Sequence, residues 1–333
     1  MKQRALSGIQ PSGAIHLGNY FGMLKQAVEL ADSGQYDCFY FLANYHAMTT
    51  VRDGERLRAL TAGAALDILS VGLSPEKAVI FRQSDVPEVC ELTWVFNCLI
   101  NKSLMELAHS YKDKVNKGID ASMGLFDYPV LMASDILIYK SHIVPIGRDQ
   151  KQHLEMTRDI AGLFNRAYGD CFPLPEPRFT ETAKVPGTTW DVDETGQRTF
   201  SKMSKSYDNH IELFGDPKAI KKKIMGIETD STPLESPKDP EKDIIFTLYS
   251  LMATDAEISD LAARYRAGGM GYGDAKKLLL RKVESIFGPY RDRRAELAAR
   301  PDDVNDILKS GAAKARAVAR QTMDDVRSRA GIS

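Results

Sequence analysis

The sequence has few cysteines, no long apolar run and almost no net charge. The four cysteines form no Cys-x-x-Cys pair and have no histidine at zinc-finger spacing, so we expect reduced, mostly buried thiols at Cys38, Cys90, Cys98 and Cys171. No run of about 18 uncharged apolar residues is present, and residues 1–6 lack the apolar core of a signal peptide. These absences predict a cytoplasmic protein with no protein-bound structural metal and no contact with a membrane.

The balance of charge excludes a protein that attracts nucleic acid over its whole surface. The 333 residues carry 44 Lys and Arg against 45 Asp and Glu, which gives a net charge of −1. Any nucleic acid must therefore be bound by a local basic patch. The hydrophobic share of 43% is that of an ordinary globular chain, and the length is sufficient for two domains.

The first half of the chain alternates short β-rich runs with helical patterns. Residues 39–43 and 78–81 have the length and composition of buried strands. The apolar residues at positions 20, 24, 27, 28 and 31 follow the three- and four-residue spacing of one helix face. This alternation predicts an α/β fold with a Rossmann-like, doubly wound parallel sheet.

The second half loses the strand signal and gains helix signals. Asp216 followed by Pro217 is typical of a helix start, and Thr254 with Glu257 has the pattern of a capping box. Between the two halves, the polar residues 180–209 predict turns or a loose hairpin. We therefore expect an α/β domain over residues 1–190, a junction over 191–211 and an all-helical domain over 212–333, whose last helix packs back on the first domain.

Residues 7–20 combine a short strand, a turn of glycine, proline and serine, and the start of a helix. Backbone N–H groups at a helix start attract anions, and Gly18 leaves room for a flat adenine ring against the backbone. His16 has a ring N–H to donate to a phosphate oxygen. The alternative is an ordinary turn with a capping histidine. The segment is not a Walker loop, because no GxxxxGK[ST] pattern is present.

A second segment, Lys202-Met203-Ser204-Lys205-Ser206, lies in the polar junction and is called the lysine loop below. Two lysines and two hydroxyls on a loop are suited to close over a polyphosphate, where the ammonium groups meet the charge that grows on the leaving group. The alternative is a basic loop that is simply solvated.

Together, the two segments resemble the paired signatures of the class I aminoacyl-tRNA synthetases. The first signature is Gln10-Pro11-Ser12-Gly13 leading to His16-Leu17-Gly18-Asn19, and the second is the lysine loop. From about Leu6 to the C-terminus the chain is similar to the bacterial tryptophanyl-tRNA synthetases. Departures from the usual family pattern at Leu6, Arg148 and residues 188–199 indicate a divergent or second-copy member.

A candidate amino-acid pocket lies in the predicted helix of residues 122–139. Tyr128, Met132 and Asp135 are spaced i, i+4 and i+7, so an aromatic ring, a thioether and a carboxylate share one face. A buried carboxylate needs a donor, and an indole N–H is one; the alternatives are a lysine partner or a capped turn. The resemblance implies that Asp135 binds the indole nitrogen, and such a site rejects phenylalanine without editing.

The resemblance implies three sets of site residues, to which the sequence adds Val144 and Ile146 as alternating residues on a predicted strand. Catalysis is assigned to His16, Lys114, Lys202, Ser204 and Lys205. ATP binding is assigned to Gln10, Pro11, Ser12, Gly18, Asn19, Gly147, Arg148, Asp149, Lys202, Met203, Ser204, Lys205 and Ser206. Tryptophan binding is assigned to Asp135, Tyr128, Met132, Gln150, His46, Gln10, Val144 and Ile146. Without the resemblance, His46 is an ordinary structural histidine and Lys114 a solvated side chain.

The function implied by the resemblance is that of a tryptophan–tRNA ligase, which uses ATP with Mg²⁺ and works as a homodimer on tRNA(Trp). Two other functions stay open: a tyrosyl-type synthetase, and a non-charging regulatory paralogue that binds tRNA or a protein partner. Residues 273–333 carry 14 Lys and Arg against nine Asp and Glu, so this region is locally basic. The candidates for contact with RNA phosphates are Arg291, Arg293, Arg294, Arg300, Arg316 and Arg320, although a solvated helical face has the same charge.

Overall fold

A computed structural model describes residues 2–106, 122–147, 150–179, 185–192, 194 and 196–333. The chain forms two compact units, which are described separately. Unit 1 comprises Met1–Gly13, Gln26–Thr180 and Arg300–Ser333, and unit 2 comprises Ala14–Lys25 and Glu181–Ala299. Within the described part of the chain, no helix is both long and apolar enough to cross a membrane.

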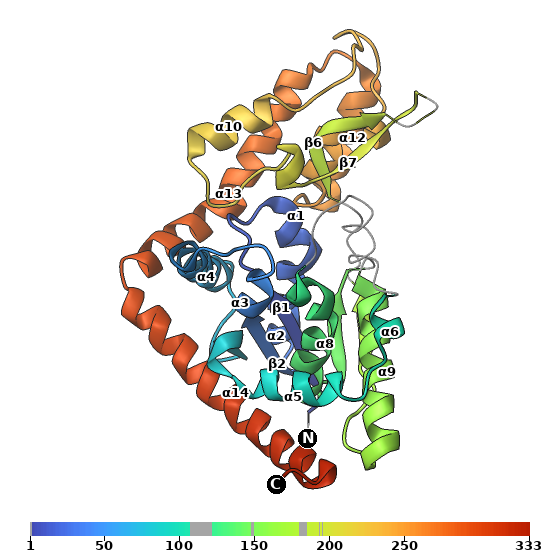
Figure 1. The fold of residues 1–333 in the computed structure, drawn as a ribbon. Coiled ribbons are helices and arrows are strands. Elements are labelled where there is room, and N and C mark those ends of the chain that lie inside the picture. The colour runs from blue at the N-terminus through green and yellow to red at the C-terminus, as the bar shows by residue number, and fades with distance from the viewer. Residues whose placement is uncertain (1, 107–121, 148–149, 180–184, 193, 195) are drawn as a thin grey trace. The chain divides into compact units, whose positions relative to one another are not determined.

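Unit 1 is built on a parallel sheet of five strands in the order β3-β2-β1-β4-β5 (Figure 1). The strands are β1 (Arg4–Ile9), β2 (Asp37–Leu42), β3 (Ala78–Arg82), β4 (Ile143–Ile146) and β5 (Glu176–Phe179). Strand β2 is almost wholly buried, as expected for a parallel strand that is covered on both faces. The predicted α/β fold is confirmed, and the strands predicted at residues 39–43 and 78–81 correspond to β2 and β3.

The helices of unit 1 cover the sheet and enclose one large apolar core. They are α2 (Lys25–Asp32, whose first residue is counted in unit 2), α3 (Asn44–Ala47), α4 (Gly54–Ser70), α5 (Glu88–Asn97), α6 (Lys102–Glu106), α8 (Met123–Leu137), α9 (Lys151–Tyr168) and α14 (Pro301–Ala330), with a 3-10 turn, η2, at Gln83–Asp85. Helix α8 packs against both α5 and α9. Two of the four free cysteines, Cys38 and Cys171, are buried. Cys90 and Cys98 are exposed, so the expectation of mostly buried thiols is only half right.

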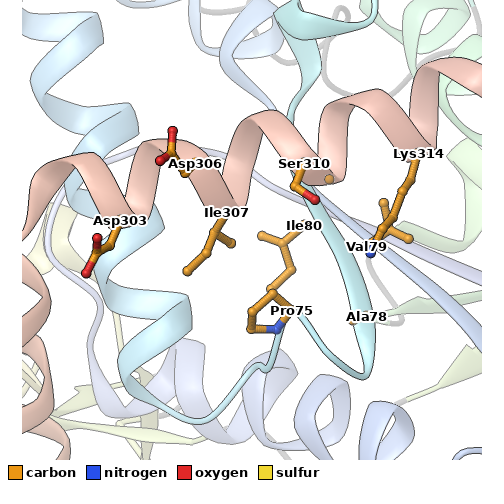
Figure 2. Close-up of a pocket in the computed structure, with 10 residues that line it drawn as sticks. Pro75, Ala78, Val79, Ile80, Asp303, Asp306, Ile307, Ser310 and Lys314 are labelled. Atoms are coloured by element: carbon orange, nitrogen blue, oxygen red, sulfur yellow. The ribbon is translucent and has the colours of Figure 1, made fainter.

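Helix α14 covers the edge of the sheet at β3 and also contacts α5 (Figure 1). Gly311 makes this approach possible, because a Cβ atom there would collide with the backbone oxygen of Ile80. Figure 2 shows the groove that remains beside this contact, with Pro75 and Ile80 opposite Ile307. Covering the edge satisfies the physical requirement that a parallel sheet should not expose an unpaired strand.

Unit 2 contains an antiparallel hairpin of β6 (Pro186–Val192) and β7 (Arg198–Lys202), in which Trp190 stacks on Phe200. Its helices are α1 (Leu17–Asn19), α10 (Pro217–Met225), α11 (Ile244–Ser250), α12 (Asp255–Ala267) and α13 (Tyr272–Ala298), with short turns η1 (Tyr20–Leu24), η4 (Lys205–Tyr207) and η5 (Pro240–Lys242). The predicted caps are confirmed: Asp216 accepts from the N–H groups of Lys218 and Ala219, and Thr254 forms a capping box with Glu257.

The compact units differ in range from the predicted domains. Residues 14–25 belong to unit 2 because their backbone pairs with residues 211–213. Helix α14 belongs to unit 1 because it packs on β3. The functional division at residues 190 and 212 stays a prediction.

Candidate active site

The first group of predicted site residues lies in unit 1, around the side chain of Asp135. Helix α8 begins where the Ser122 hydroxyl caps the N–H of Leu125, and it carries Tyr128, Met132 and Asp135 on successive turns. Tyr128 and Met132 are half-buried, whereas Asp135 is only 3% exposed. The helix thus buries the Asp135 carboxylate on the same face as the ring of Tyr128 and the thioether of Met132.

Asp135 is held by two donors that come from the carboxyl ends of neighbouring strands. His46, in α3 after β2, has Nε2 2.9 Å from Asp135 Oδ2. Gln83, at the start of η2 after β3, donates from Nε2 to Oδ1 at 2.9 Å and to Oδ2 at 2.8 Å. Burial raises the pKa of Asp135, and the bonds from His46 and Gln83 oppose that rise. The partners of this carboxylate are thus a histidine and a glutamine, not the lysine considered from sequence.

The other predicted tryptophan-binding residues lie in the same unit. The Tyr128 hydroxyl lies 2.6 Å from His153 Nε2, and the Tyr128 ring meets His46 edge-on, with 6.2 Å between ring centres. Val144 and Ile146 are buried on β4 and belong to the core, while Gln150 is half-buried at the start of α9. Gln10, which follows β1, is exposed.

The second group of site residues lies in unit 2, where the His16–Asn19 part of the first signature contacts the lysine loop. The N–H of Leu17 donates to the carbonyl of Ile211, and the N–H of Leu213 donates to the carbonyl of Ile15. The Gly18 N–H donates to Sδ of Met203 in the lysine loop at 3.3 Å. A Cβ atom at Gly18 would lie 2.9 Å from the His16 ring, so glycine is needed here for the packing of His16.

His16 is buried, and positively charged side chains lie near it. Its side chain is buried, and its pKa falls to about 4 because of burial and the positive charges of Lys205, His210 and Lys202. The ring is therefore neutral at pH 7. Among the described residues, Nδ1 of His16 and Nδ1 of His210 have no hydrogen-bond partner, and the two rings are 5.7 Å apart. These features suit the binding of an anion. Its charge would be attracted by Lys202 and Lys205, and the Nδ1 atoms of His16 and His210 would remain available for hydrogen bonds to it.

The side chain of Asn209 holds the lysine loop in place through hydrogen bonds. This side chain is fully buried, and its Oδ1 accepts from the N–H of Ser204 at 2.7 Å. Its Nδ2 donates to Ser201 Oγ at 2.9 Å and to the carbonyl of Lys202 at 3.2 Å. Gly187 gives Asn209 its space, because a Cβ at position 187 would overlap the Asn209 amide.

The remaining predicted ATP-binding residues are distributed between the units. Pro11 is buried and Ser12 exposed after β1, and Gly147 is half-buried after β4. Asn19 Oδ1 accepts from the His16 N–H at 3.1 Å, and Ser204 Oγ accepts from the N–H of Ser206. The predicted site residues Lys114, Arg148 and Asp149 lie outside the described part of the chain.

Comparison with known proteins identifies the family that carries these two groups of residues. The family model described as tRNA synthetases class I (W and Y) matches residues 1–288. The chain belongs to this synthetase family. The tryptophan–tRNA ligase of Rhodopirellula baltica is 50% identical to this chain, and the match covers 99% of this chain and 99% of the relative. The tryptophan–tRNA ligase of Fusobacterium nucleatum is 48% identical, and the match covers 99% of this chain and 98% of the relative.

A solved structure agrees with the sequence match. Tryptophanyl-tRNA synthetase from Campylobacter jejuni, complexed with ADP and tryptophan, is 46% identical and superposes with a TM-score of 0.90 over 98% of this synthetase and 99% of that chain. The predicted family and fold are therefore confirmed. Because these relatives are 50% and 48% identical over nearly their whole length, the divergence expected from Leu6, Arg148 and residues 188–199 is minor.

Two residues of this synthetase were missing from the predicted sites, Gln83 and Asn209. Gln83 lies two residues after the predicted strand of residues 78–81, and the end of a parallel strand is where ligand-binding residues gather, so a signal was present. Asn209 is the last residue of the polar stretch predicted to form a hairpin. Its role depends on bonds across that hairpin, and the sequence alone gives no indication of them.

Five of the six arginines proposed for RNA contact are engaged within their own unit, and one of them is Arg300, whose Nη1 lies 3.6 Å from Asp303 Oδ2. Arg316 and Arg320 donate from Nε to Glu88 Oε1 at 2.7 and 3.2 Å. Arg291 donates to the carbonyl of Leu213, and the Arg294 guanidinium lies 5.3 Å from the Phe214 ring centre. The ion pairs with Glu88 attach α14 to α5, which makes a structural role for Arg316 and Arg320 the better interpretation.

Proposed function

We propose that this synthetase is a tryptophan–tRNA ligase that uses Asp135 as the acceptor for the indole N–H. The observation that carries the assignment is the buried Asp135 carboxylate, held by His46 and Gln83 beside the half-buried Tyr128. An indole N–H only donates, whereas the phenol of tyrosine both donates and accepts. The donors of His46 and Gln83 already bind Asp135 and are not available to the phenol oxygen of tyrosine. The surroundings of Asp135 therefore suit tryptophan better than tyrosine.

The reaction has two steps, and neither needs a nucleophilic side chain. A carboxylate oxygen of tryptophan attacks the α-phosphorus of ATP, and the bond to the bridging oxygen breaks, which releases pyrophosphate and leaves tryptophanyl-adenylate. A hydroxyl of the terminal ribose of tRNA(Trp) then attacks the carbonyl carbon, and AMP leaves. Positioning and neutralisation of charge supply most of the rate in such phosphoryl chemistry.

In unit 2, His16, Lys202 and Lys205 hold the phosphates. His16 is neutral and donates from a ring nitrogen, while the two ammonium groups meet the charge that develops on pyrophosphate. Ser204 anchors the loop that carries the lysines, and Lys114 adds a further positive charge. The adenosine and the rest of the nucleotide are assigned to Gln10, Pro11, Ser12, Gly18, Asn19, Gly147, Arg148, Asp149, Met203 and Ser206.

In unit 1, the proposed tryptophan contacts divide by chemistry. Asp135 accepts the indole N–H, and His46 keeps that carboxylate in place. Tyr128 and Met132 pack on the ring, with Val144 and Ile146 as apolar support. Gln150 and Gln10 bind the polar end of the amino acid.

Mg²⁺ is proposed to arrive with the triphosphate. Among the described residues, no group of three or more His, Cys, Asp or Glu side chains is arranged to hold a metal ion. Phosphate oxygens are good ligands for Mg²⁺, which usually keeps several waters. When bound, the ion neutralises phosphate charge, and Lys202 and Lys205 add to that effect.

The tRNA is proposed to bind through the helical residues 212–333, and the enzyme is proposed to act in the cytoplasm. The exposed Arg293, and Arg300 with its exposed ion pair to Asp303, are the candidates for phosphate contact. A homodimer is proposed because Trp94 on α5 and Met123 on α8 are 70% and 76% exposed, although α5 and α8 pack together. Large exposed apolar side chains are typical of protein contact surfaces.

The proposed function is tested by charging purified tRNA(Trp) with tryptophan, with tyrosine as the competing substrate. ATP–pyrophosphate exchange measures the first step separately. We expect exchange and charging with tryptophan only, and a loss of tryptophan affinity on the order of 10-fold or more in Asp135→Asn. Equal exchange with tyrosine, or unchanged tryptophan affinity in the variant, would contradict the assignment.

A further inference from the structure

One buried side chain, Gln83, forms hydrogen bonds both with Asp135 and with the backbone of His46, the other donor to Asp135. Gln83 is 2% exposed, and its Nε2 donates to both carboxylate oxygens. Its Oε1 accepts from the backbone N–H groups of Tyr45 and His46, at 3.0 and 3.4 Å. The same amide therefore fixes the carboxylate and also the backbone of the residue whose ring is the second donor.

The hydrogen bonds to Asp135 leave a definite place for one more donor. Among the described residues, Oδ2 accepts from both His46 and Gln83, whereas Oδ1 accepts from Gln83 alone. A carboxylate has about four acceptor sites. The remaining capacity is therefore on Oδ1, and the direction of Oδ1 is set by the amide of Gln83.

A buried carboxylate that loses its donors takes up a proton more readily. A protonated Asp135 would itself donate, and the pocket would then lose its preference for a ligand that donates. Gln83 is suited to prevent this, because a neutral amide donor stabilises the anion without adding a charge that would compete for it.

We propose that Gln83 is a positioning residue that sets amino-acid specificity, by holding Asp135 as an acceptor whose Oδ1 is directed to a ring N–H. The inference rests on the proposed role of Asp135 in binding tryptophan. Gln83 acts through Asp135 and does not touch the substrate. The role requires an amide on a side chain of this length. An ionised glutamate at position 83 would place a second acceptor beside the Asp135 carboxylate, and asparagine is one methylene shorter than glutamine.

The test compares tryptophan with β-(3-benzothienyl)alanine, an analogue in which sulfur replaces the indole N–H. ATP–pyrophosphate exchange gives kcat and KM for each amino acid, and the ratio of the two kcat/KM values measures how strongly the N–H is selected. In Gln83→Met, which keeps the size of the side chain and removes its polar atoms, we expect this ratio to fall about 10- to 100-fold, mainly through the KM for tryptophan. The values for the analogue change little.

Asn44→Ala is the matched control. Asn44 donates to Ser84 Oγ at 2.7 Å and accepts from the Ser84 N–H at 3.0 Å, so it joins the same two segments as Gln83 without touching Asp135. We expect this control to lower thermal stability and to keep the ratio of the parent. A fall of the ratio in Asn44→Ala equal to that in Gln83→Met would overturn the inference, because the effect would then be one of general loosening.

Gln83→Glu keeps the test decisive if the methionine variant does not fold. Glutamate retains the acceptor for Tyr45 and His46 and can donate to Asp135 only while it is protonated. We expect its ratio to fall from about pH 6 to about pH 9, relative to the parent at each pH. His46 from α3 contacts Asp135, and Cys90 from α5 and Tyr139 after α8 interact electrostatically with it, in the parent as in the variant, so the comparison with the parent removes their effects. A ratio that stays equal to the parent throughout overturns the inference.

The Asp135→Asn variant separates the two possible failures. If Asp135→Asn and Gln83→Met both keep the preference of the parent, the proposed indole acceptor is wrong. If Asp135→Asn loses the preference and Gln83→Met keeps it, Asp135 is the acceptor and only the role of Gln83 is wrong.

Discussion

At the scale of single residues, His16 links the stability of the protein to pH. Its native pKa of about 4 lies below the usual value of 6.5, chiefly because of burial. Between these two values the unfolded chain binds more protons than the native one, so the contribution of His16 is complete above pH 6.5 and is lost as the pH falls toward 4. The slope is at most about 1.4 kcal/mol per pH unit.

The measurement is urea unfolding of the parent and of His16→Asn at several values between pH 7 and pH 4. Asparagine keeps a donor but does not titrate in this range. We expect the difference in free energy of unfolding between the two proteins to shrink or reverse as the pH falls. A difference that is independent of pH would show that His16 is not buried as a neutral ring.

The two lysines of the lysine loop are predicted to act in the transition state. Lys202→Ala or Lys205→Ala should slow ATP–pyrophosphate exchange by on the order of 10²-fold, with tryptophan affinity nearly unchanged, because their partner is the charge that develops on the leaving pyrophosphate. Lys221→Ala is the control, since Lys221 is an exposed lysine of α10 in the same unit. Exchange at the parental rate in both loop variants would refute the role.

At the scale of elements, the hairpin of β6 and β7 supports the lysine loop through Asn209. Asn209→Ala removes the acceptor of the Ser204 N–H and the donor to Lys202, so the loop loses its fixed position. We expect exchange to slow by about 10-fold and unfolding to become easier by about 1–3 kcal/mol. Tryptophan affinity should not change, because Asn209 lies in unit 2 and the proposed tryptophan contacts lie in unit 1.

Gly187→Ala tests the same support from the other side. Its Cβ would displace the Asn209 amide, so the single variant should resemble Asn209→Ala, and the double variant should be little worse than either. Gly273→Ala is the control, because a Cβ there meets no atom within 4 Å. Additive losses in the double variant would show that Gly187 and Asn209 act independently.

The elements that local patterns define were predictable, and the contacts that join them were not. Apolar runs gave β2 and β3, and the capping residues Asp216 and Thr254 marked two helix starts, because these features depend on neighbouring residues alone. The face shared by Tyr128, Met132 and Asp135 followed from helix spacing. Gln83 meets Asp135 only because β3 and α8 pack into the same core, which no single segment encodes.

At the scale of the whole molecule, the surface of α5 and α8 predicts self-association. Trp94→Glu places a charge where we propose that a second copy packs, so light scattering should show the molecular mass falling from that of a dimer to that of a monomer. Leu174→Glu, which alters another exposed apolar side chain of unit 1, should leave the mass unchanged. A monomeric parent would contradict the proposal directly.

The return of α14 to unit 1 has a consequence for synthesis on the ribosome. The sheet of unit 1, whose strands β2 and β3 lead into the residues that hold Asp135, is closed at its β3 edge by residues near the end of the described chain. While those residues are still inside the exit tunnel, the nascent sheet has an open flank, although every residue of unit 2 has already been translated. Unit 2 is thus able to acquire its fold first, and the proposed tryptophan site gains its last supporting layer only after α14 has left the tunnel.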